Sequence, residues 1–152
     1  CVTLANEDLL WLKPYVLKNQ APVVLAEEIR WVSQDQMKQQ RSSFLERIEA
    51  WRLAWESRDT EHYLTFYGDD FVTAGISREK FAEHKHRVNA AKRYIKVKLD
   101  HLSLFRYPGE AMVLAEFTMD YDSDNYQFRS KKEQYWRQDA SGQWRIFREE
   151  NR

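Results

Sequence analysis

Cys1 is the residue whose chemistry stands out first, because it is the only cysteine among 152 residues. A cysteine attacks as its thiolate and needs a base and an oxyanion-binding site around it. Near its reference pKa of about 8.5 a thiol is mostly protonated at neutral pH. The residues beside Cys1 supply no such partners. We therefore expect no enzymatic activity from this chain by itself.

A set of aromatic residues and one acid forms the second candidate site. Flat rings with polar tips are suited to stack on a sugar or a peptide, but aromatics at helical spacing more often belong to a core. We favour a core role for the two tryptophans of the helical part and leave the tyrosines open between the two roles. A carboxylate turned inward could act as an acid or base. The predicted pocket residues are Trp51, Trp55, Tyr63, Tyr67, Tyr121, Trp136 and Glu149.

Charge and composition exclude several functions. The net charge is zero, which argues against general nucleic-acid binding. No apolar run approaches the roughly 20 residues of a membrane span. The four histidines are not grouped with acids or thiols at ligand spacing, so we expect no metal site and no cofactor.

A basic stretch runs from Arg78 to Lys98, with eight cations against two acids, a balance of +6. Such a stretch could meet an anionic polymer. We favour the simpler interpretation of a solvated helix face.

Helix signals occupy the first two thirds of the chain. Asn6 begins a short helix that Pro14 interrupts. Val23-Val24-Leu25 is typical of a short buried strand. Ser33 and Ser43 both carry the capping-box spacing and leave the start of a long helix open. That helix places Phe44, Ile48, Trp51 and Trp55 on one stripe. Asp59 and Ser77 cap two further helices, the first ending at Gly68, and Phe71-Val72-Thr73 predicts a strand.

Residues 95–148 alternate as strands joined by polar turns. A change of phase at Asp100-His101 predicts a β-bulge. The short connections predict an antiparallel, curved sheet. Tyr126, Phe128 and Trp136 share one parity, and we expect them on an open face through which two copies self-associate.

Residues 43–152 resemble the nuclear transport factor 2-like, or SnoaL-like, family. The phrases that carry the likeness are Trp51-Arg52-Leu53-Ala54-Trp55-Glu56, Tyr63-Leu64-Thr65-Phe66-Tyr67, Lys131-Lys132-Glu133-Gln134-Tyr135-Trp136 and Gly142-Gln143-Trp144-Arg145-Ile146. The resemblance implies an α+β, cone-like fold with three helices packed on a curved antiparallel sheet.

The opening from Cys1 to Leu9 resembles the end of the active-site motif of bacterial L,D-transpeptidases. It implies that 1–33 is the C-terminal remnant of a catalytic domain and that 34–152 is a separate domain. Cys1 would then be catalytic only in a full-length parent, since the family's upstream histidine and the Gly before the cysteine are not in this sequence.

The combined resemblance implies an accessory domain of a cell-wall L,D-transpeptidase or L,D-carboxypeptidase. Its ligand would be peptidoglycan or a muropeptide, and it would form a dimer with a second copy of the chain. It would be located in the periplasm or cell envelope. Two alternatives stay open: a stand-alone SnoaL-like enzyme acting on a small apolar substrate, and a structural dimerisation module.

Overall fold

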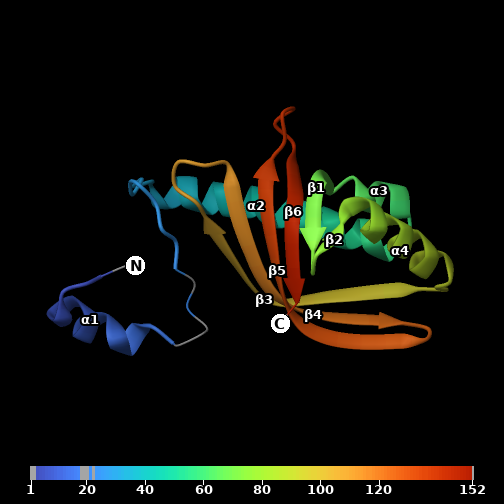
Figure 1. Ribbon diagram of the computed structural model, residues 1–152, viewed down its shortest axis with the longest axis horizontal. Coiled ribbons are helices and arrows are strands. Elements are labelled where there is room, and N and C mark those ends of the chain that lie inside the picture. Colours follow the sequence, from blue (N-terminus) through green and yellow to red (C-terminus); the bar gives the residue numbers. More distant parts are fainter. Residues whose placement is uncertain (1–2, 18–20, 22, 152) are drawn as a thin grey trace.

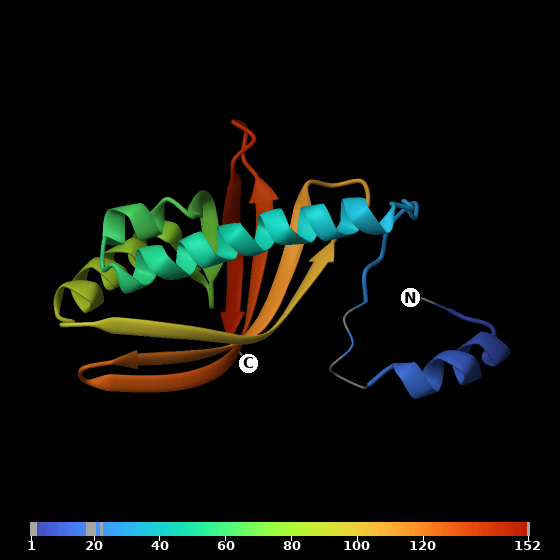
Figure 2. The same ribbon diagram turned by 180° about the vertical axis from the view of Figure 1, so that it is seen from behind.

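The computed structural model describes residues 3–17, 21 and 23–151. Its N-terminal part holds a short helix, α1 (Asn6–Leu12), and a 3-10 turn, η1 (Lys13–Tyr15), which has Pro14 in its first turn. No residue of α1 or η1 is buried, and this part lies to one side of the cone in Figures 1 and 2. The predicted strand at 23–25 is wrong, because these residues are outside any helix or strand and have no partner strand.

Three helices follow: α2 (Gln34–Glu56), α3 (Thr60–Leu64) and α4 (Arg78–Ala90). Ser33 begins α2 with a complete capping box to Gln36, which decides between the two predicted starts. The Asp59 side chain accepts a hydrogen bond from the His62 backbone N–H, at 3.0 Å, and so caps α3. Gly68 does not end this helix, because it lies inside a strand that pairs with the last strand of the chain.

Six strands form one curved sheet in the order β2-β1-β6-β5-β4-β3. Their bounds are β1 (Tyr67–Thr73), β2 (Ile76–Ser77), β3 (Ile95–Arg106), β4 (Met112–Ser123), β5 (Tyr126–Gln138) and β6 (Trp144–Asn151). All neighbours are antiparallel except β1 and β6, which are parallel. The antiparallel, curved sheet predicted for residues 95–148 is confirmed. The predicted bulge is confirmed, since the register of β3 shifts between Asp100 and Ser103 and His101 has a φ of 55°.

The bulge divides the sheet into two regions. Figure 1 shows the β4–β5 hairpin and the start of β3 running out below α4, while the other ends of these strands turn toward α2. A bulge bends a strand and increases its twist. The bent sheet and the helices therefore enclose space between them, as the predicted fold class requires.

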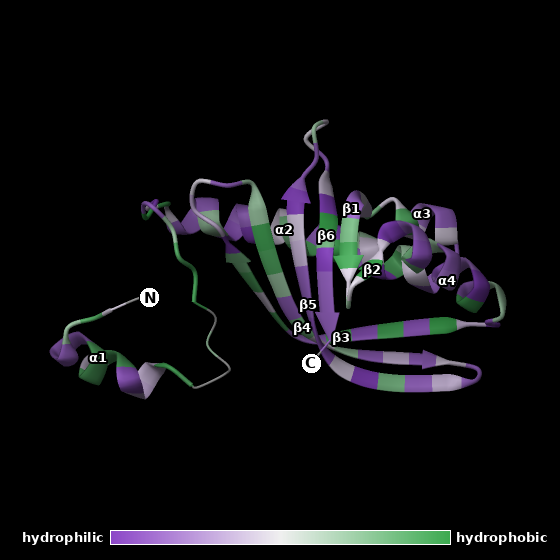
Figure 3. Cartoon of the chain, viewed as in Figure 1, coloured by the Kyte–Doolittle hydropathy of each residue, from purple (hydrophilic) through white to green (hydrophobic). Residues whose placement is uncertain are grey.

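Alternation along the strands assigns each residue to a face, and hydrophobic and hydrophilic bands follow one another along the hairpin in Figure 3. Tyr121 pairs with Phe128, and Val113 pairs with Trp136. Since Val113 and Trp136 belong to the core, Tyr126, Phe128 and Trp136 lie on the helix-facing side. The expected placement of these three rings on an open outer face is wrong, because the parity that joins them also joins them to the core.

None of the helices in the described residues is long and apolar enough to cross a membrane. The 23-residue helix α2 is polar on its outer side and buries a single stripe: Phe44, Ile48, Trp51, Ala54 and Trp55.

Candidate ligand-binding site

A cavity of about 360 Å³ lies between α4 and the β4–β5 half of the sheet. Three of the predicted pocket residues, Trp55, Tyr121 and Glu149, line it directly. The other four, Trp51, Tyr63, Tyr67 and Trp136, lie deeper and are almost completely buried. Cys1 lies outside the described residues. The full lining is Trp55, Thr73, Phe81, His84, Lys85, Val88, Asn89, Lys92, Met119, Tyr121, Tyr126, Phe128, Lys132, Glu149 and Asn151.

Glu149 is the centre of a hydrogen-bond network at the base of the cavity. Strand β6 turns it inward opposite Gln134 of β5, and only 5% of the residue is exposed. Its Oε1 contacts Lys132 Nζ at 2.5 Å, and its Oε2 accepts from Gln134 Nε2 at 3.0 Å. Burial alone would raise the pKa of Glu149, but the Lys132 ammonium and these hydrogen bonds hold it below its usual value. Glu149 is therefore a fixed carboxylate.

The buried tyrosines continue this network toward α2. Trp51 Nε1 donates to Tyr67 Oη at 3.0 Å, the two tyrosine hydroxyls are 2.6 Å apart, and Tyr67 Oη lies 3.4 Å from Glu149 Oε2. An ionised carboxylate only accepts, so Tyr67 gives its single proton to Glu149. Tyr63 must then donate to Tyr67. Burial, and next the Glu149 charge, raise the pKa of both tyrosines well above 10, which keeps the phenols neutral.

The tryptophans act first as core. Trp51 is fully buried, and its ring lies 5.6 Å from that of Trp55 and 6.0 Å from that of Phe117. Trp136 donates its indole N–H to Gln134 Oε1 at 3.2 Å, which orients the amide that donates to Glu149. The sequence-based preference for a core role is consistent with these contacts, and Trp55 in addition faces the cavity.

Lys85 of α4 brings a positive charge into this aromatic environment. Its Nζ lies 4.2 Å from the centroid of Trp55, 5.2 Å from Phe81 and 5.5 Å from Tyr63. Within the described part of the chain it has no hydrogen-bonded or ion-pair partner. Burial, opposed by Glu149 and reinforced by Lys132, lowers the pKa of Lys85 to about 8. Cation–π contacts stabilise the ammonium but satisfy none of its three N–H donors.

Lysines outnumber acids around the cavity. Lys85, Lys92 and Lys132 face the single carboxylate of Glu149, which leaves two positive charges. Lys132 is paired with Glu149 and Lys92 donates to Asn125 Oδ1. Lys85 is thus the lysine of the cavity whose N–H donors have no partner among the described residues, and an anion is the ligand chemistry that it favours.

Polar atoms without partners gather at the same place. Among the described residues, Trp55 Nε1, Asn89 Oδ1 and Ser130 Oγ are buried without a hydrogen bond. Two of these residues line the cavity, and Ser130 lies on the same face of β5 as Phe128 and Lys132. Buried polar groups are normally paired, so these orphaned atoms indicate a site whose hydrogen bonds are completed by a ligand or by water.

Sequence reasoning missed the lysines and the amide. The basic stretch was interpreted as a solvated face, yet Lys92 is only 9% exposed and Lys85 turns toward three rings. A signal for Lys132 and Gln134 was present, since they share their strand parity with Trp136. For Lys85 the signal was its position one turn after Phe81, on the apolar side of α4.

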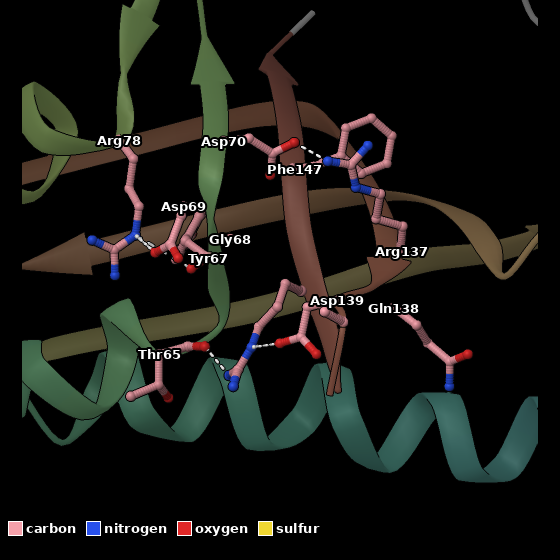
Figure 4. Close-up of a pocket in the computed structure, with 12 residues that line it drawn as sticks. Thr65, Tyr67, Gly68, Asp69, Asp70, Arg78, Arg137, Gln138, Asp139 and Phe147 are labelled. Carbon is pink, nitrogen blue, oxygen red and sulfur yellow. Dashed lines mark hydrogen bonds and ion pairs between the residues drawn. The ribbon is translucent and has the colours of Figure 1, made fainter. Parts of the chain in front are cut away.

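A second, larger hollow of about 770 Å³ lies at the outer side of β1, β5 and β6 (Figure 4). Its arginines are matched by aspartates: Arg78 lies 3.9 Å from Asp69, and Arg137 pairs with Asp70. Arg145 contacts Asp139 at 3.1 Å. These charges satisfy one another at an open surface, where such pairs stabilise little, so this hollow is a weaker candidate than the cavity under α4.

A metal centre finds no support in the described residues, where no group of three or more His, Cys, Asp or Glu side chains could hold an ion.

Comparison with known proteins identifies a matching family and similar solved structures. Residues 43–150 match the family described as the Cds6 C-terminal NTF2-like domain. Bd1075 of Bdellovibrio bacteriovorus superimposes with a TM-score of 0.89 at 26% identity, over 97% of this chain and 52% of that one. A search of curated protein sequences found no match.

Two further solved structures are similar to this chain. The helical cell shape determining protein Pgp2 from Campylobacter jejuni gives a TM-score of 0.74 at 29% identity, over 98% of this chain and 53% of that one. An NTF2-like protein of unknown function from Pseudomonas putida covers 75% of this chain and 86% of that one at 18% identity and a TM-score of 0.63, which shows the shared fold alone. The chain thus spans about half the length of Bd1075 and Pgp2.

Proposed function

Because this chain belongs to the family of Cds6 C-terminal NTF2-like domains, we propose that it is the ligand-binding domain of a cell-wall L,D-transpeptidase or L,D-carboxypeptidase. Its ligand would be a peptidoglycan stem peptide, with a carboxylate of the peptide on Lys85. The observation that carries the proposal is the Lys85 ammonium, held in the cavity beside orphaned polar atoms and without an anion of its own.

The neighbours support a cell-wall context. Pgp2 is named as a protein that determines helical cell shape, and bacterial cell shape depends on the wall. The likeness to Bd1075 and Pgp2 extends over 97–98% of this chain, and so includes most of residues 1–33. We propose that this segment belongs to the catalytic domain, with Cys1 as its nucleophile, and that the protein works in the periplasm or cell envelope.

The cavity is less suited to the alternative, a small-molecule enzyme of the same fold. Such an enzyme needs an acid or base that can exchange a proton with substrate. Glu149 is occupied by Lys132, Gln134 and Tyr67, and the pKa of Tyr63 and Tyr67 is raised far above neutrality. These three groups hold charge and shape and are not arranged to transfer protons, whereas Lys85, with its pKa lowered to about 8, is the group that an enzyme of this fold would have to use.

Calorimetric titration with a purified muropeptide at two salt concentrations tests the proposal. We expect binding to the unmodified protein and at least a tenfold loss for Lys85→Met, which keeps an unbranched apolar side chain one atom shorter and removes the charge. Lys80→Met, on the exposed side of the same helix, is the matched control and should bind within twofold of the unmodified protein.

Salt should weaken this binding without abolishing it, because exposed charges of the basic stretch are screened within about 10 Å at 0.1 M salt whereas a contact inside the cavity is screened less. No heat at either salt concentration, together with tight binding of an apolar small molecule, would favour the enzyme alternative. Equal binding by Lys85→Met and the unmodified protein would remove Lys85 from the site.

A further inference from the structure

A row of aromatic rings leads from the cavity out to the tip of the β4–β5 hairpin. Ring centroids are 5.2 Å apart between Trp55 and Tyr121, 6.2 Å between Tyr121 and Tyr126, and 6.2 Å between Tyr126 and Phe128. The first two residues are 6% and 7% exposed, and the last two are 55% and 36% exposed. The row therefore starts in the core and ends in solvent.

The two exposed rings, Tyr126 and Phe128, lie near the tip of the β4–β5 hairpin. Tyr126 and Phe128 lie on the helix-facing side of β5, on which Ser130, Lys132 and Gln134 are covered. In Figures 1 and 2 the tip of the hairpin ends on the same side of the molecule as α4, and at this tip Tyr126 and Phe128 stay 55% and 36% exposed. Neither ring belongs to the hydrophobic core. Their exposure is therefore not explained by a structural role in the fold.

The two outer rings are nearly parallel to each other and partly exposed. Their planes differ by 18°, so they present nearly parallel faces. An aromatic face carries partial negative charge, and the C–H face of a pyranose ring is apolar with partial positive charge on its hydrogens. Lys92 Nζ lies 5.9 Å from the Tyr126 centroid, and the polar side chains of His84 and Asn151 line the same cavity.

We propose that Tyr126 and Phe128 form a platform on which a pyranose ring of a glycan stacks at the mouth of the cavity. The proposal deepens the function given above and rests on it for the choice of glycan. If the cavity takes the carboxylate of a stem peptide, the sugar that carries the peptide must lie near the mouth, where the platform lies.

A second copy of the chain fits this surface less well. A stable interface needs about 800 Å² from each partner, and an aromatic side chain buries about 150–250 Å² even when fully covered. Two partly exposed rings supply well under that area. On the same face of the hairpin their cross-strand neighbours, Ser123 and Tyr121, are already buried and add little area. A small ligand with one apolar face matches these dimensions.

The test is titration with chitotetraose, a β-1,4-linked tetramer of N-acetylglucosamine, followed by the NMR signals of the protein. We expect weak, saturable binding to the unmodified protein and at least a tenfold loss in the double variant Tyr126→Ala/Phe128→Ala. A variant with Tyr126→Trp and Phe128→Trp, which keeps flat faces, should retain binding. The control Tyr94→Ala removes a ring that is 39% exposed and does not line the cavity, and it should bind within twofold of the unmodified protein.

Two outcomes would overturn the platform. One is the absence of chitotetraose binding to the unmodified protein, or equal binding by the double alanine variant once urea melts show that this variant is folded. The other is a change from dimer to monomer on removing the two rings, which would assign them to self-association.

The platform and the cavity can fail separately. Lys85→Met should weaken binding of the free stem peptide more than binding of chitotetraose, and the double alanine variant, whose rings also line the cavity, should weaken binding of chitotetraose more than binding of the free stem peptide. Binding of the stem peptide without chitotetraose overturns the platform alone. Binding of chitotetraose without the stem peptide overturns the cavity assignment and leaves the rings as a glycan site.

Discussion

Removing the Lys132 charge should destabilise the protein strongly, because it leaves a buried carboxylate with reduced compensation. Lys132 and Glu149 are 3% and 5% exposed, and their charged atoms are 2.5 Å apart. Breaking a buried ion pair by removing one partner typically costs about 3–5 kcal/mol. In Lys132→Met, Glu149 keeps Gln134 and Tyr67 as neutral donors and the Lys85 charge nearby. We therefore expect a loss of about 3 kcal/mol in the free energy of unfolding at pH 7.

A double variant separates the charge from the packing. Lys132→Met/Glu149→Gln removes both charges and keeps an acceptor for Tyr67 and Gln134. Replacing a buried pair is far less destabilising than breaking it, so this variant should be more stable than Lys132→Met alone. Lys131→Met is the matched control. The neighbouring Lys131 lies on the other face of β5 and its Nζ is 3.8 Å from Glu116 in a half-exposed pair, so its loss should cost under about 1 kcal/mol.

The pH dependence of stability gives a second test, because the pKa of Glu149 should be lowered in the unmodified protein and raised in Lys132→Met. In the unmodified protein the pKa of Glu149 is lowered from 4.5, so its stabilisation is present above pH 4.5 and is lost as the pH falls below that value. Without Lys132, burial should raise the pKa of Glu149. The difference in stability between Lys132→Met and the unmodified protein should then shrink as the pH falls through the raised pKa of Glu149 in the variant, which lies above 4.5, to the lowered pKa in the unmodified protein.

Urea denaturation followed by tryptophan fluorescence measures both effects. A free energy of unfolding for Lys132→Met within 1 kcal/mol of the unmodified protein at pH 7 would refute the reasoning. So would a deficit that grows toward acid pH, since it would mean that Glu149 is not the group left uncompensated.

Three further substitutions test other parts of the structure. Lys85→Met should stabilise the fold by about 1–3 kcal/mol at pH 7, because folding lowers the pKa of Lys85 from 10.5 to about 8. Thermal melts should show that this extra stability of the variant disappears as the pH rises from 8 to 10.5. A variant less stable than the unmodified protein at pH 7 would contradict the prediction. Ala74→Gly should stabilise by about 1 kcal/mol, since Ala74 has a φ of 47°; a lower urea midpoint would count against strain there. Trp55→Ala, at a position 6% exposed, should destabilise by about 3–5 kcal/mol, and a thermal melt identical to that of the unmodified protein would show that Trp55 is not core.

Local signals in the sequence were sufficient for most of the elements. The Ser33 capping box, the stripe from Phe44 to Trp55 and the phase change at Asp100-His101 are each encoded within a few residues, because capping, helical periodicity and strand alternation act between near neighbours. The cone-like fold class came from the resemblance of residues 43–152 to the nuclear transport factor 2-like family and is confirmed. The predicted strand at 23–25 failed, since a strand needs a partner that local pattern does not supply.

The candidate site depended on contacts between distant parts of the chain. Glu149 was predicted to face inward, but its partners Lys132 and Tyr67 come from other strands, and Lys85 comes from a helix between them. These contacts between distant residues decide that Lys132 is paired with Glu149 and that Lys85 has no ion-pair partner among the described residues.

Tertiary structure also reversed the assignment of Tyr126 and Phe128. Their shared parity was readable from the sequence, but parity does not say which face of a sheet the helices cover. That choice is made when the bent sheet closes against α2 and α4, because Val113 and Trp136 must be buried and every residue of the same parity follows them. The sequence determined which residues share a face, and the packing of helices on the curved sheet decided that this face leads into a cavity.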